Sequence, residues 1–471
     1  MNIKSFSINF SMNNELAKKT VCSLFLAYAF FMLYVCIHIE ARVPDENWFW
    51  GLSRDIHWHH SIKEMFMTEN YLGYGALYWQ ILKVIKSLLF ARLLWGSMLI
   101  SIPVCVILFC KKVLCVPNTS VLAAIILYLS CPLSWFTGKI IGPEILGQFF
   151  GCWGTLFLFM GYKKTQYSLI AIGALAIGLA SGIKLYNGFF AAFCGLYILQ
   201  EEIHRKDFKA LAKIALICFG VFALGFCIGG GLGMIANSPL YKKNLPHVSK
   251  FSFAYMLHIL FGQSFAWDLV NCGGMSNTIM NVPSCIVLFL LSFVSRENRF
   301  LKFSCMFTTM LLILSCCFSG QFLGWYLLPM IFVLSLLASS AKFIFPLLIV
   351  NLVLVFVPLS YQIGSKVEQI KNIKNIDALK LHVSNWQKQY DDSYKSYIFV
   401  ELCDALPFTY GHDENTVKQL LFISNRALAC PYYKTFFDMA KEKRNGYSLL
   451  DYKDGVWFCK FEKDVPAVLS E

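Results

Sequence analysis

Residues 20–50 read TVCSLFLAYAFFMLYVCIHIEARVPDENWFW, and this stretch decides the class of fold. Its first part, residues 20–39, contains no Asp, Glu, Lys or Arg. A helix of about 20 such residues spans the roughly 30 Å of hydrocarbon in a bilayer. Mostly polar residues precede the run and no small-residue cleavage site follows it, which favours a retained membrane helix over a signal peptide. Asp45 and Glu46 come soon after, framed by a proline and three aromatic residues.

Apolar runs of similar length recur along the chain as far as residue 360. The chain is 57% hydrophobic and 15% charged, whereas a soluble globular protein has about 25% charged residues. We therefore predict an all-α polytopic membrane protein with about 11 transmembrane helices. The predicted helices cover 20–38, 91–110, 119–137, 145–162, 167–183, 185–200, 209–235, 280–295, 303–319, 325–340 and 342–360. Residues 65–82 have the glycines and aromatic residues of a helix lying in the membrane interface.

Basic residues set the predicted orientation, because Lys and Arg concentrate in cytoplasmic loops. Each short basic segment follows an even-numbered predicted helix: Lys111–Lys112, Lys163–Lys164, His204–Lys206, Arg296–Lys302 and Lys342. One arrangement satisfies them all, with the N-terminus inside and the C-terminal tail outside. The tail from residue 361 holds 15 Lys and Arg and 15 Asp and Glu, so the whole net charge of +13 lies before it. The positive charge therefore reports topology and not nucleic-acid binding.

The sequence predicts three parts: a cytoplasmic N-terminal tail (1–19), a transmembrane part (20–364) and a small α/β extracytoplasmic domain (365–471). Within the last, residues 396–402 are predicted as a strand and 415–428 as a helix. Residues 447–463 place a Lys-Asp-Gly turn between two alternating apolar stretches, which predicts a β-hairpin.

The 18 cysteines are scattered, without a Cys-x-x-Cys pair, and most lie inside apolar runs. We interpret them as small hydrophobic side chains in helix packing. Only Cys403, Cys430 and Cys459 lie in the tail. Two of them could form one disulfide, and the sequence does not decide whether they do. The run IGGGLGM at 228–234 lacks the Lys-Ser/Thr of a phosphate loop, so we interpret it as a helix-packing or kink feature.

With this orientation, unusual polar residues gather in the outer loops. The first outer loop (39–90) holds Asp45, Glu46 and Arg54, the second holds Lys139 and Glu144, and the third turns around Lys184. A lysine at the centre of a membrane helix costs about 2.5–3.5 kcal/mol, so Lys184 must lie near the surface, snorkel or meet an anion. Carboxylates facing cations of other loops predict a cavity for an anionic, lipid-anchored ligand, in which acids transfer protons and cations hold a phosphate.

The order of these motifs resembles the GT-C superfamily of membrane glycosyltransferases. The nearest branch is that of protein O-mannosyltransferases and lipid A aminoarabinose transferases (glycosyltransferase family 39-like). VPDENWFW resembles its acidic pair after the first helix, and GPEILGQFFGCWG, with Glu144, its second outer acidic position. AIGLASGIKLYNGFF is similar to its Gly-rich helix ending in a lysine, and GWYLLPMIFVLSLLA, with Tyr326, to its late RYLLP segment near the donor site. The resemblance spans residues 20–360.

The resemblance implies inverting transfer of a sugar from a polyprenyl-phosphate-linked donor to a lipid, glycan or protein acceptor. Asp45 is expected to take the proton of the acceptor hydroxyl, with Glu46 and Glu144 as the other catalytic carboxylates. The expected substrate-binding residues are Arg54, Lys139, Lys184 and Tyr326. The arginine usual before the tyrosine is Trp325 here, so the cation at the phosphate has to come from one of the other three positions.

Each of these assignments has a plainer alternative. The acidic pair fits a solvated loop, Glu144 fits a helix start behind Pro143, and Lys184 fits a snorkelling residue at a helix end. Tyr326 also fits the aromatic belt of the membrane interface. His57, His59 and His60 could bind a divalent metal, although their spacing is not a strong ligand motif. No other cofactor is expected.

Two other functions compete with sugar transfer. A polytopic transporter or lipid flippase is expected to carry charged residues in mid-bilayer and inverted repeats with paired broken helices. The sequence shows neither a repeat nor a chain of acidic residues deep in the membrane. A non-catalytic assembly or receptor subunit is expected to tolerate substitution of both Asp45 and Glu144. Compact loops and the lack of retention signals favour a bacterial inner membrane with the site facing the periplasm. The expected partners are therefore the bilayer, the lipid-linked donor and the acceptor.

Overall fold

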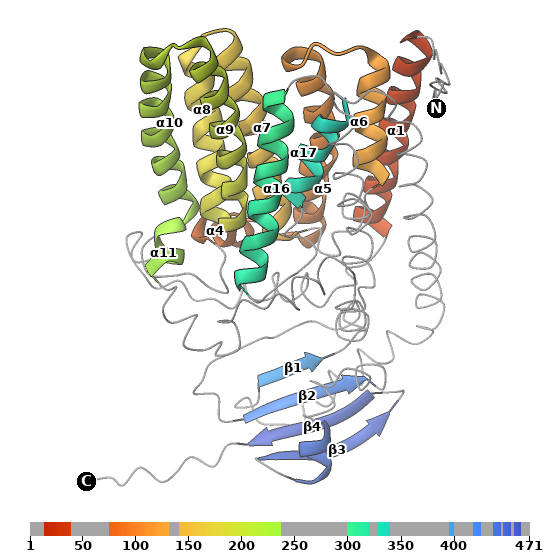
Figure 1. Cartoon of the computed structure of the whole chain (residues 1–471). Coiled ribbons are helices and arrows are strands. Elements are labelled where there is room, and N and C mark those ends of the chain that lie inside the picture. The colour runs from red at the N-terminus through yellow and green to blue at the C-terminus, as the bar shows by residue number, and fades with distance from the viewer. Residues whose placement is uncertain are drawn as a thin grey trace, which may run out of the picture.

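The computed structural model describes residues 14–38, 75–130, 141–236, 299–319 and 328–339 in the first part of the chain, and 395–399, 418–424, 437–443, 446–453 and 456–462 in the tail. The first part is a helical bundle (Figure 1). Its elements are α1 (Asn14–His38), α4 (Ala76–Val84), α5 (Leu88–Leu108), a π turn (Phe109–Val113), α6 (Asn118–Ser130), α7 (Pro143–Lys163), α8 (Tyr167–Ile183), a 3₁₀ turn (Leu185–Asn187), α9 (Gly188–Arg205), α10 (Phe208–Gly229), α11 (Gly231–Ala236), α16 (Arg299–Ser319) and α17 (Leu328–Ser339).

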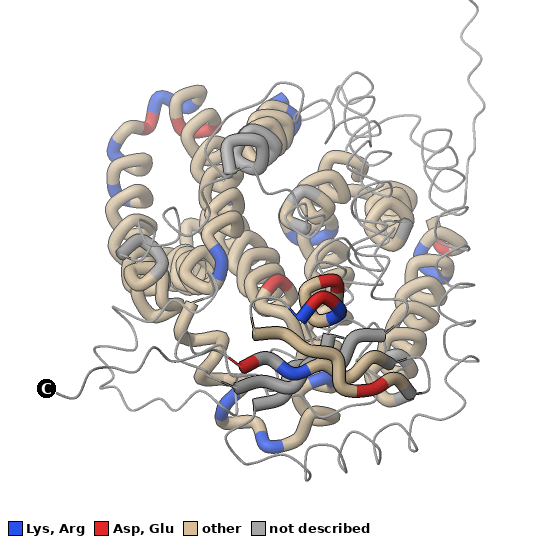
Figure 2. Tube along the Cα trace, turned by 90° about the horizontal axis from the view of Figure 1, so that it is seen from below, with Lys and Arg blue, Asp and Glu red and all other residues tan. Residues whose placement is uncertain are grey.

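Several helices have the length and composition of membrane spans. Within the described residues, four are long and apolar enough to cross a bilayer: Asn14–Tyr34, Leu88–Val113, Pro143–Lys163 and Phe208–Gly229. Figure 2 shows that most of the described helical length carries neither Lys, Arg, Asp nor Glu. The chain is therefore a multi-pass membrane protein, as predicted.

The helix limits largely follow the predicted runs. α8 has the predicted limits, whereas α1 begins at Asn14, inside the predicted N-terminal tail, and α9 continues to Arg205. The predicted helices 280–295 and 342–360 lie outside the described residues, as does the predicted boundary between residues 364 and 365.

The predicted helix 209–235 is broken, because α10 ends at Gly229 and α11 begins at Gly231. Gly230 lies in the left-handed region with φ of 97°, a conformation that glycine adopts without steric cost. A Cβ at Gly230 would lie 2.3 Å from the backbone nitrogen of Ala76. This confirms that the glycine-rich run is a packing and kink feature.

The basic segments meet at one end of the bundle, the upper end in Figure 1. The turns that follow α5, α7 and α9 lie there, and the start of α16 joins them. Gln200 Nε2 donates to Ser304 Oγ at 2.9 Å, and the rings of His204 and Phe300 lie 5.6 Å apart. The predicted common side is therefore confirmed for the described basic residues, while residues 296–298 and Lys342 lie outside the described residues.

The predicted interfacial segment (65–82) overlaps α4, and three large side chains in the overlap are buried in the protein. Tyr78, Trp79 and Leu82 are fully buried, and the rings of Tyr78 and Trp79 meet edge to face at 5.0 Å. α4 contacts α8 and α10. Its aromatic residues thus serve packing between helices, which the sequence pattern does not distinguish from contact with lipid headgroups.

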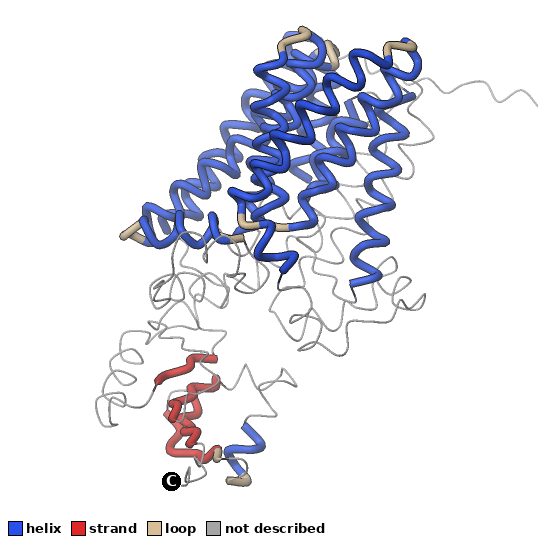
Figure 3. Tube along the Cα trace, turned by 90° about the vertical axis from the view of Figure 1, so that its left-hand side faces the viewer, coloured by secondary structure: helices blue, strands red, loops and turns tan. Residues whose placement is uncertain are grey.

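The tail forms a four-stranded sheet in the order β1-β2-β4-β3, beyond the lower end of the bundle (Figures 1 and 3). The strands are β1 (Lys395–Phe399), β2 (Lys418–Ser424), β3 (Tyr447–Lys453) and β4 (Val456–Glu462). β1 and β2 are parallel, and the antiparallel pair of β3 and β4 confirms the predicted hairpin. β1 confirms the predicted strand over residues 396–399, and residues 400–402 lie outside the described residues.

The predicted helix at 415–428 is wrong, because this segment contains β2. Its apolar run, Leu420 to Ile423, is too short to separate a buried strand from a helix by periodicity. β2 pairs with β1 on one edge and with β4 on the other. The backbone hydrogen bonds on both edges come from segments distant in sequence, and they decide the conformation.

The buried cysteines behave as small hydrophobic residues. Buried thiols in the helices are those of Cys36, Cys105, Cys110, Cys152, Cys194 and Cys305. In the sheet, burial raises the pKa of the free Cys459 thiol to about 12, so this thiol stays protonated at neutral pH. Cys403 and Cys430 lie outside the described residues.

Candidate functional site

The start of α7 and the end of α8 bring an acid and a base together. Lys184 Nζ lies 3.6 Å from Glu144 Oε1. Both residues are buried, with 9% of Lys184 and 3% of Glu144 exposed. Of the alternatives for Lys184, the structure shows that it meets an anion. Two predicted outer segments therefore share one end of the bundle, opposite the basic turns.

Local sequence places both side chains at helix termini. Pro143 is the first residue of α7, where its fixed φ and missing N–H suit the helix start, and Glu144 follows in the first turn. Lys184 is the C-cap of α8 in an extended conformation. A carboxylate at a helix N-terminus and an ammonium at a helix C-terminus each complement the helix dipole. The predicted helix-start role of Glu144 and its pairing with Lys184 thus coexist.

Two aromatic side chains fix the segment that leads into α7. Tyr78 OH donates to the carbonyl of Ile141 at 2.7 Å, and Trp95 Nε1 donates to the carbonyl of Gly142 at 2.9 Å. Both bonds are buried. They satisfy carbonyls that face no water and thereby hold Glu144 at a defined height at the bundle end.

Glycines allow three chain segments to meet beside Lys184. The Gly75 N–H donates to the carbonyl of Ile183 at 3.0 Å. A Cβ at Gly75 would lie 1.9 Å from the Gly229 oxygen and 2.2 Å from the Gly182 oxygen. Backbone atoms cannot yield to such an overlap, so glycine is required at this crossing.

The 3₁₀ turn after Lys184 places a buried amide against α7. Asn187 is fully buried, and its Nδ2 donates to the carbonyl of Ala180 at 3.1 Å. A Cβ at Gly147 would lie 2.1 Å from Asn187 Nδ2. Glu144, Gly147 and Gln148 share one face of α7, because they are three and four residues apart. The Glu144–Lys184 ion pair and the Asn187 amide therefore lie against neighbouring positions of the same face of α7.

Arg92 is a buried charge that the sequence reasoning missed. It is 7% exposed and lies one turn before Trp95 on α5, which brings it to the end of the bundle where α7 begins. The prediction treated 91–110 as one apolar run. An arginine in the first turn of such a helix was the available signal, since a buried arginine is costly in a membrane.

Most of the predicted site residues cannot be placed. Asp45, Glu46, Arg54, Lys139 and Tyr326 lie outside the described residues, as do the three histidines 57, 59 and 60. In the described ranges, no group of three or more His, Cys, Asp or Glu residues has the geometry of a metal site.

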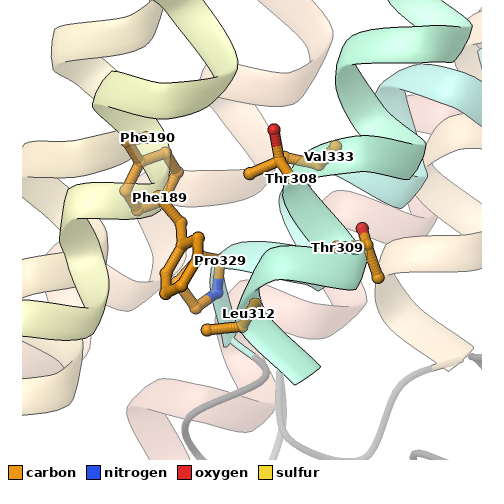
Figure 4. Close-up of a pocket in the computed structure, with 7 residues that line it drawn as sticks. All are labelled: Phe189, Phe190, Thr308, Thr309, Leu312, Pro329 and Val333. Carbon is orange, nitrogen blue, oxygen red and sulfur yellow. The ribbon is translucent and has the colours of Figure 1, made fainter. Parts of the chain in front are cut away.

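A small cavity lies between α9, α16 and α17 (Figure 4). Its lining consists of Phe189, Phe190, Thr308, Thr309, Leu312, Pro329 and Val333. Thr308 Oγ1 donates to the carbonyl of Ser304 at 2.6 Å. The neighbouring Thr309 Oγ1 is buried and has no hydrogen-bond partner among the described residues.

These two threonines give a matched stability test. Thr309→Val is expected to leave the free energy of unfolding unchanged or to raise it, because a buried hydroxyl without a partner is replaced by a methyl group of similar shape. Thr308→Val is expected to lower it by about 0.5–1.5 kcal/mol, because a hydrogen bond is lost. Unfolding in mixed micelles at increasing denaturing detergent measures both. Equal destabilisation by the two changes would contradict the described environment of Thr309.

The bundle and the sheet beyond the end where Glu144 meets Lys184 define a GT-C-like fold. The chain is similar to ArnT from Cupriavidus metallidurans, whose crystal structure was solved bound to undecaprenyl phosphate. The TM-score is 0.57 at 12% sequence identity, and the match covers 94% of this chain and 98% of ArnT. No protein-family model and no curated protein sequence matches the chain. The similarity confirms the resemblance at the level of the fold.

Proposed function

We propose that the chain transfers a sugar from a polyprenyl-phosphate-linked donor to a hydroxyl of a lipid, glycan or protein. We place the reaction on the outer face of a bacterial inner membrane, with the site facing the periplasm. The buried Glu144–Lys184 pair at one bundle end carries this proposal. The fold similarity supports it, because ArnT was solved with a polyprenyl phosphate.

Lys184 is proposed to bind the phosphate of the donor. In the reaction, the acceptor oxygen attacks the anomeric carbon, the bond from this carbon to the phosphate oxygen breaks, and the lipid phosphate leaves with the electron pair. Negative charge grows on that phosphate oxygen, where an ammonium stabilises it most effectively away from water. Glu144 is proposed to hold Lys184 in position, because its Oε1 lies 3.6 Å from the Lys184 ammonium and both side chains are buried.

The proton of the acceptor hydroxyl is proposed to pass to Asp45, with Glu46 beside it raising its proton affinity. Arg54, Lys139 and Tyr326 complete the proposed substrate contacts. The leaving phosphate is already anionic, so the reaction needs a cation more than a general acid. Whether a divalent metal contributes is tested by repeating the assay with a chelator.

Asp45→Asn is expected to lower sugar transfer by about 10²–10⁴-fold, because the amide cannot accept the proton. The assay uses the purified chain in proteoliposomes, a panel of labelled polyprenyl-phosphate hexoses and pentoses, and membranes from cells that lack the chain as a source of acceptor. Asp207→Asn is the matched control. Asp207 caps α10 at the opposite end of the bundle by accepting from the Ala210 N–H at 3.0 Å, and asparagine caps equally well.

Two results would contradict the proposal. One is transfer at the unchanged rate by folded Asp45→Asn protein, which refutes the assigned base. The other is movement of the intact lipid-linked sugar across sealed vesicles without transfer, which indicates a flippase or transporter.

A further inference from the structure

Asn187 presents a buried acceptor whose orientation is fixed. Its Nδ2 donates to the carbonyl of Ala180 at 3.1 Å. Turning the amide over would bring two oxygens together, so the hydrogen bond determines which atom is Oδ1. Oδ1 is buried and has no hydrogen-bond partner among the described residues. Buried acceptors of this kind are rare in folded proteins and call for an explanation.

A second acceptor, Glu144 Oε1, lies on the neighbouring turn of α7. Glu144 Oε1 is buried and contacts Lys184 Nζ at 3.6 Å, but makes no hydrogen bond within the described part of the chain. Asn187 lies against Gly147, which shares a helix face with Glu144. Lys184 supplies the cation at Glu144, and its backbone carbonyl accepts a hydrogen bond from the backbone N–H of Asn187 at 3.0 Å, so the two residues are tied together.

This combination selects for the chemistry of a ligand. A phosphate group is an acceptor at neutral pH, so it suits Lys184 and cannot satisfy an amide oxygen. A sugar hydroxyl is a donor and does satisfy it. A ligand that carries a phosphate next to hydroxyl groups therefore fits the cation and the acceptors at once.

We propose that Asn187 Oδ1 accepts a hydrogen bond from a hydroxyl of the donor's sugar, while Lys184 binds the adjoining phosphate. This inference rests on the proposed function and adds to it a specificity-determining residue. Asn187 then distinguishes the sugar-loaded lipid from the unloaded polyprenyl phosphate that remains after transfer. Binding sites that hydrogen-bond a hydroxyl reject ligands lacking it, because the acceptor is left buried and unpaired.

The test compares two ligands on two proteins. Dissociation constants are measured for polyprenyl phosphate and for a panel of polyprenyl-phosphate hexoses and pentoses, with the unaltered chain and with Asn187→Leu. The leucine has a similar size and lacks the acceptor. Asn187→Leu is expected to weaken binding of the preferred sugar-loaded lipid about tenfold and to leave binding of the unloaded lipid unchanged. Gln200→Leu removes an amide at the opposite bundle end and is expected to change neither constant.

Monodeoxy analogues of the preferred sugar locate the hydroxyl. One analogue is expected to bind the unaltered chain about tenfold more weakly than the parent and to bind Asn187→Leu as tightly as the parent does. Asn187→Asp retains an acceptor oxygen and is expected to keep the dependence on that hydroxyl, which tests the inference even if Asn187→Leu does not fold.

The outcomes separate the inference from the proposed function. Failure of the unaltered chain to bind any polyprenyl phosphate, loaded or unloaded, would contradict the proposed function. Binding of both lipids with equal losses in Asn187→Leu would overturn the inference and indicate a structural role for Asn187. A monodeoxy series without a weakened member would overturn it as well.

Discussion

Lys184→Met is expected to lower the free energy of unfolding by about 3–5 kcal/mol, because it leaves the Glu144 carboxylate buried without its cation. Glu144 is 3% exposed and lies 3.6 Å from the ammonium. Glu144→Gln is expected to have an effect of similar size, since it removes the carboxylate that the buried Lys184 ammonium contacts. The measurement is unfolding of the purified chain in mixed micelles, followed by loss of tryptophan fluorescence.

The double variant Glu144→Gln/Lys184→Met is the decisive member of the series. Replacing a buried ion pair by neutral groups of similar volume is often nearly neutral. The double variant is therefore expected to recover most of the stability lost in each single variant. Because it lacks the cation, it is expected to bind polyprenyl phosphate as weakly as Lys184→Met alone. Stability and binding thus respond differently to the same pair of changes.

An exposed ion pair provides the control for this cycle. Arg205 Nη2 lies 3.2 Å from Glu201 Oε2, and 58% of the Arg205 side chain is exposed. Glu201→Gln is expected to cost only about 0.3–0.5 kcal/mol. If Lys184→Met lowered the free energy of unfolding as little as Glu201→Gln, the Glu144 carboxylate would have to be solvated, and the site would not be buried.

Sequence patterns predicted the membrane-spanning helices more completely than the residues of the candidate site. α8 was predicted within its observed limits, because a polar turn precedes an uninterrupted apolar run that ends at a lysine. Periodicity could not identify β2, whose conformation depends on partner strands distant in sequence. The tail therefore needed tertiary information, whereas a membrane helix satisfies its own backbone hydrogen bonds.

For the candidate site, the sequence predicted that Glu144 and Lys184 lie on the same side of the membrane, and the structure brings these two together. The basic turns predicted the orientation of the helices, and this orientation places Glu144 and Lys184 at the same end of the bundle. Arg92 and Asn187 were missed for different reasons. Arg92 was missed because one charged residue lowers the mean hydropathy of a helix as long as α5 only slightly. The role of Asn187 depends on the absence of a side chain at Gly147, across an interface between segments that no local pattern connects.

Gly225→Ala is expected to lower the free energy of unfolding by about 1–3 kcal/mol, because the added methyl group meets backbone. A Cβ at Gly225 would lie 2.3 Å from the Leu175 oxygen and 3.0 Å from the Leu179 nitrogen. α8 and α10 meet along two glycine pairs spaced four residues apart on each helix, Gly178 with Gly225 and Gly182 with Gly229. Small residues at this spacing let membrane helices approach closely, and van der Waals contact then holds them.

Gly220→Ala is the matched control, because Gly220 lies on the same helix and a Cβ there would contact no other segment of the described residues within 4 Å. It is expected to leave stability unchanged or to raise it by up to about 1 kcal/mol, since alanine favours the helix. Gly225→Ala is also expected to weaken polyprenyl phosphate binding, because the crossing of Gly75, Gly182 and Gly229 supports the residue before Lys184. Equal tolerance of both alanines in unfolding and binding would mean that α8 and α10 are further apart than described. Lys184 would then lose the backbone support that places it at Glu144.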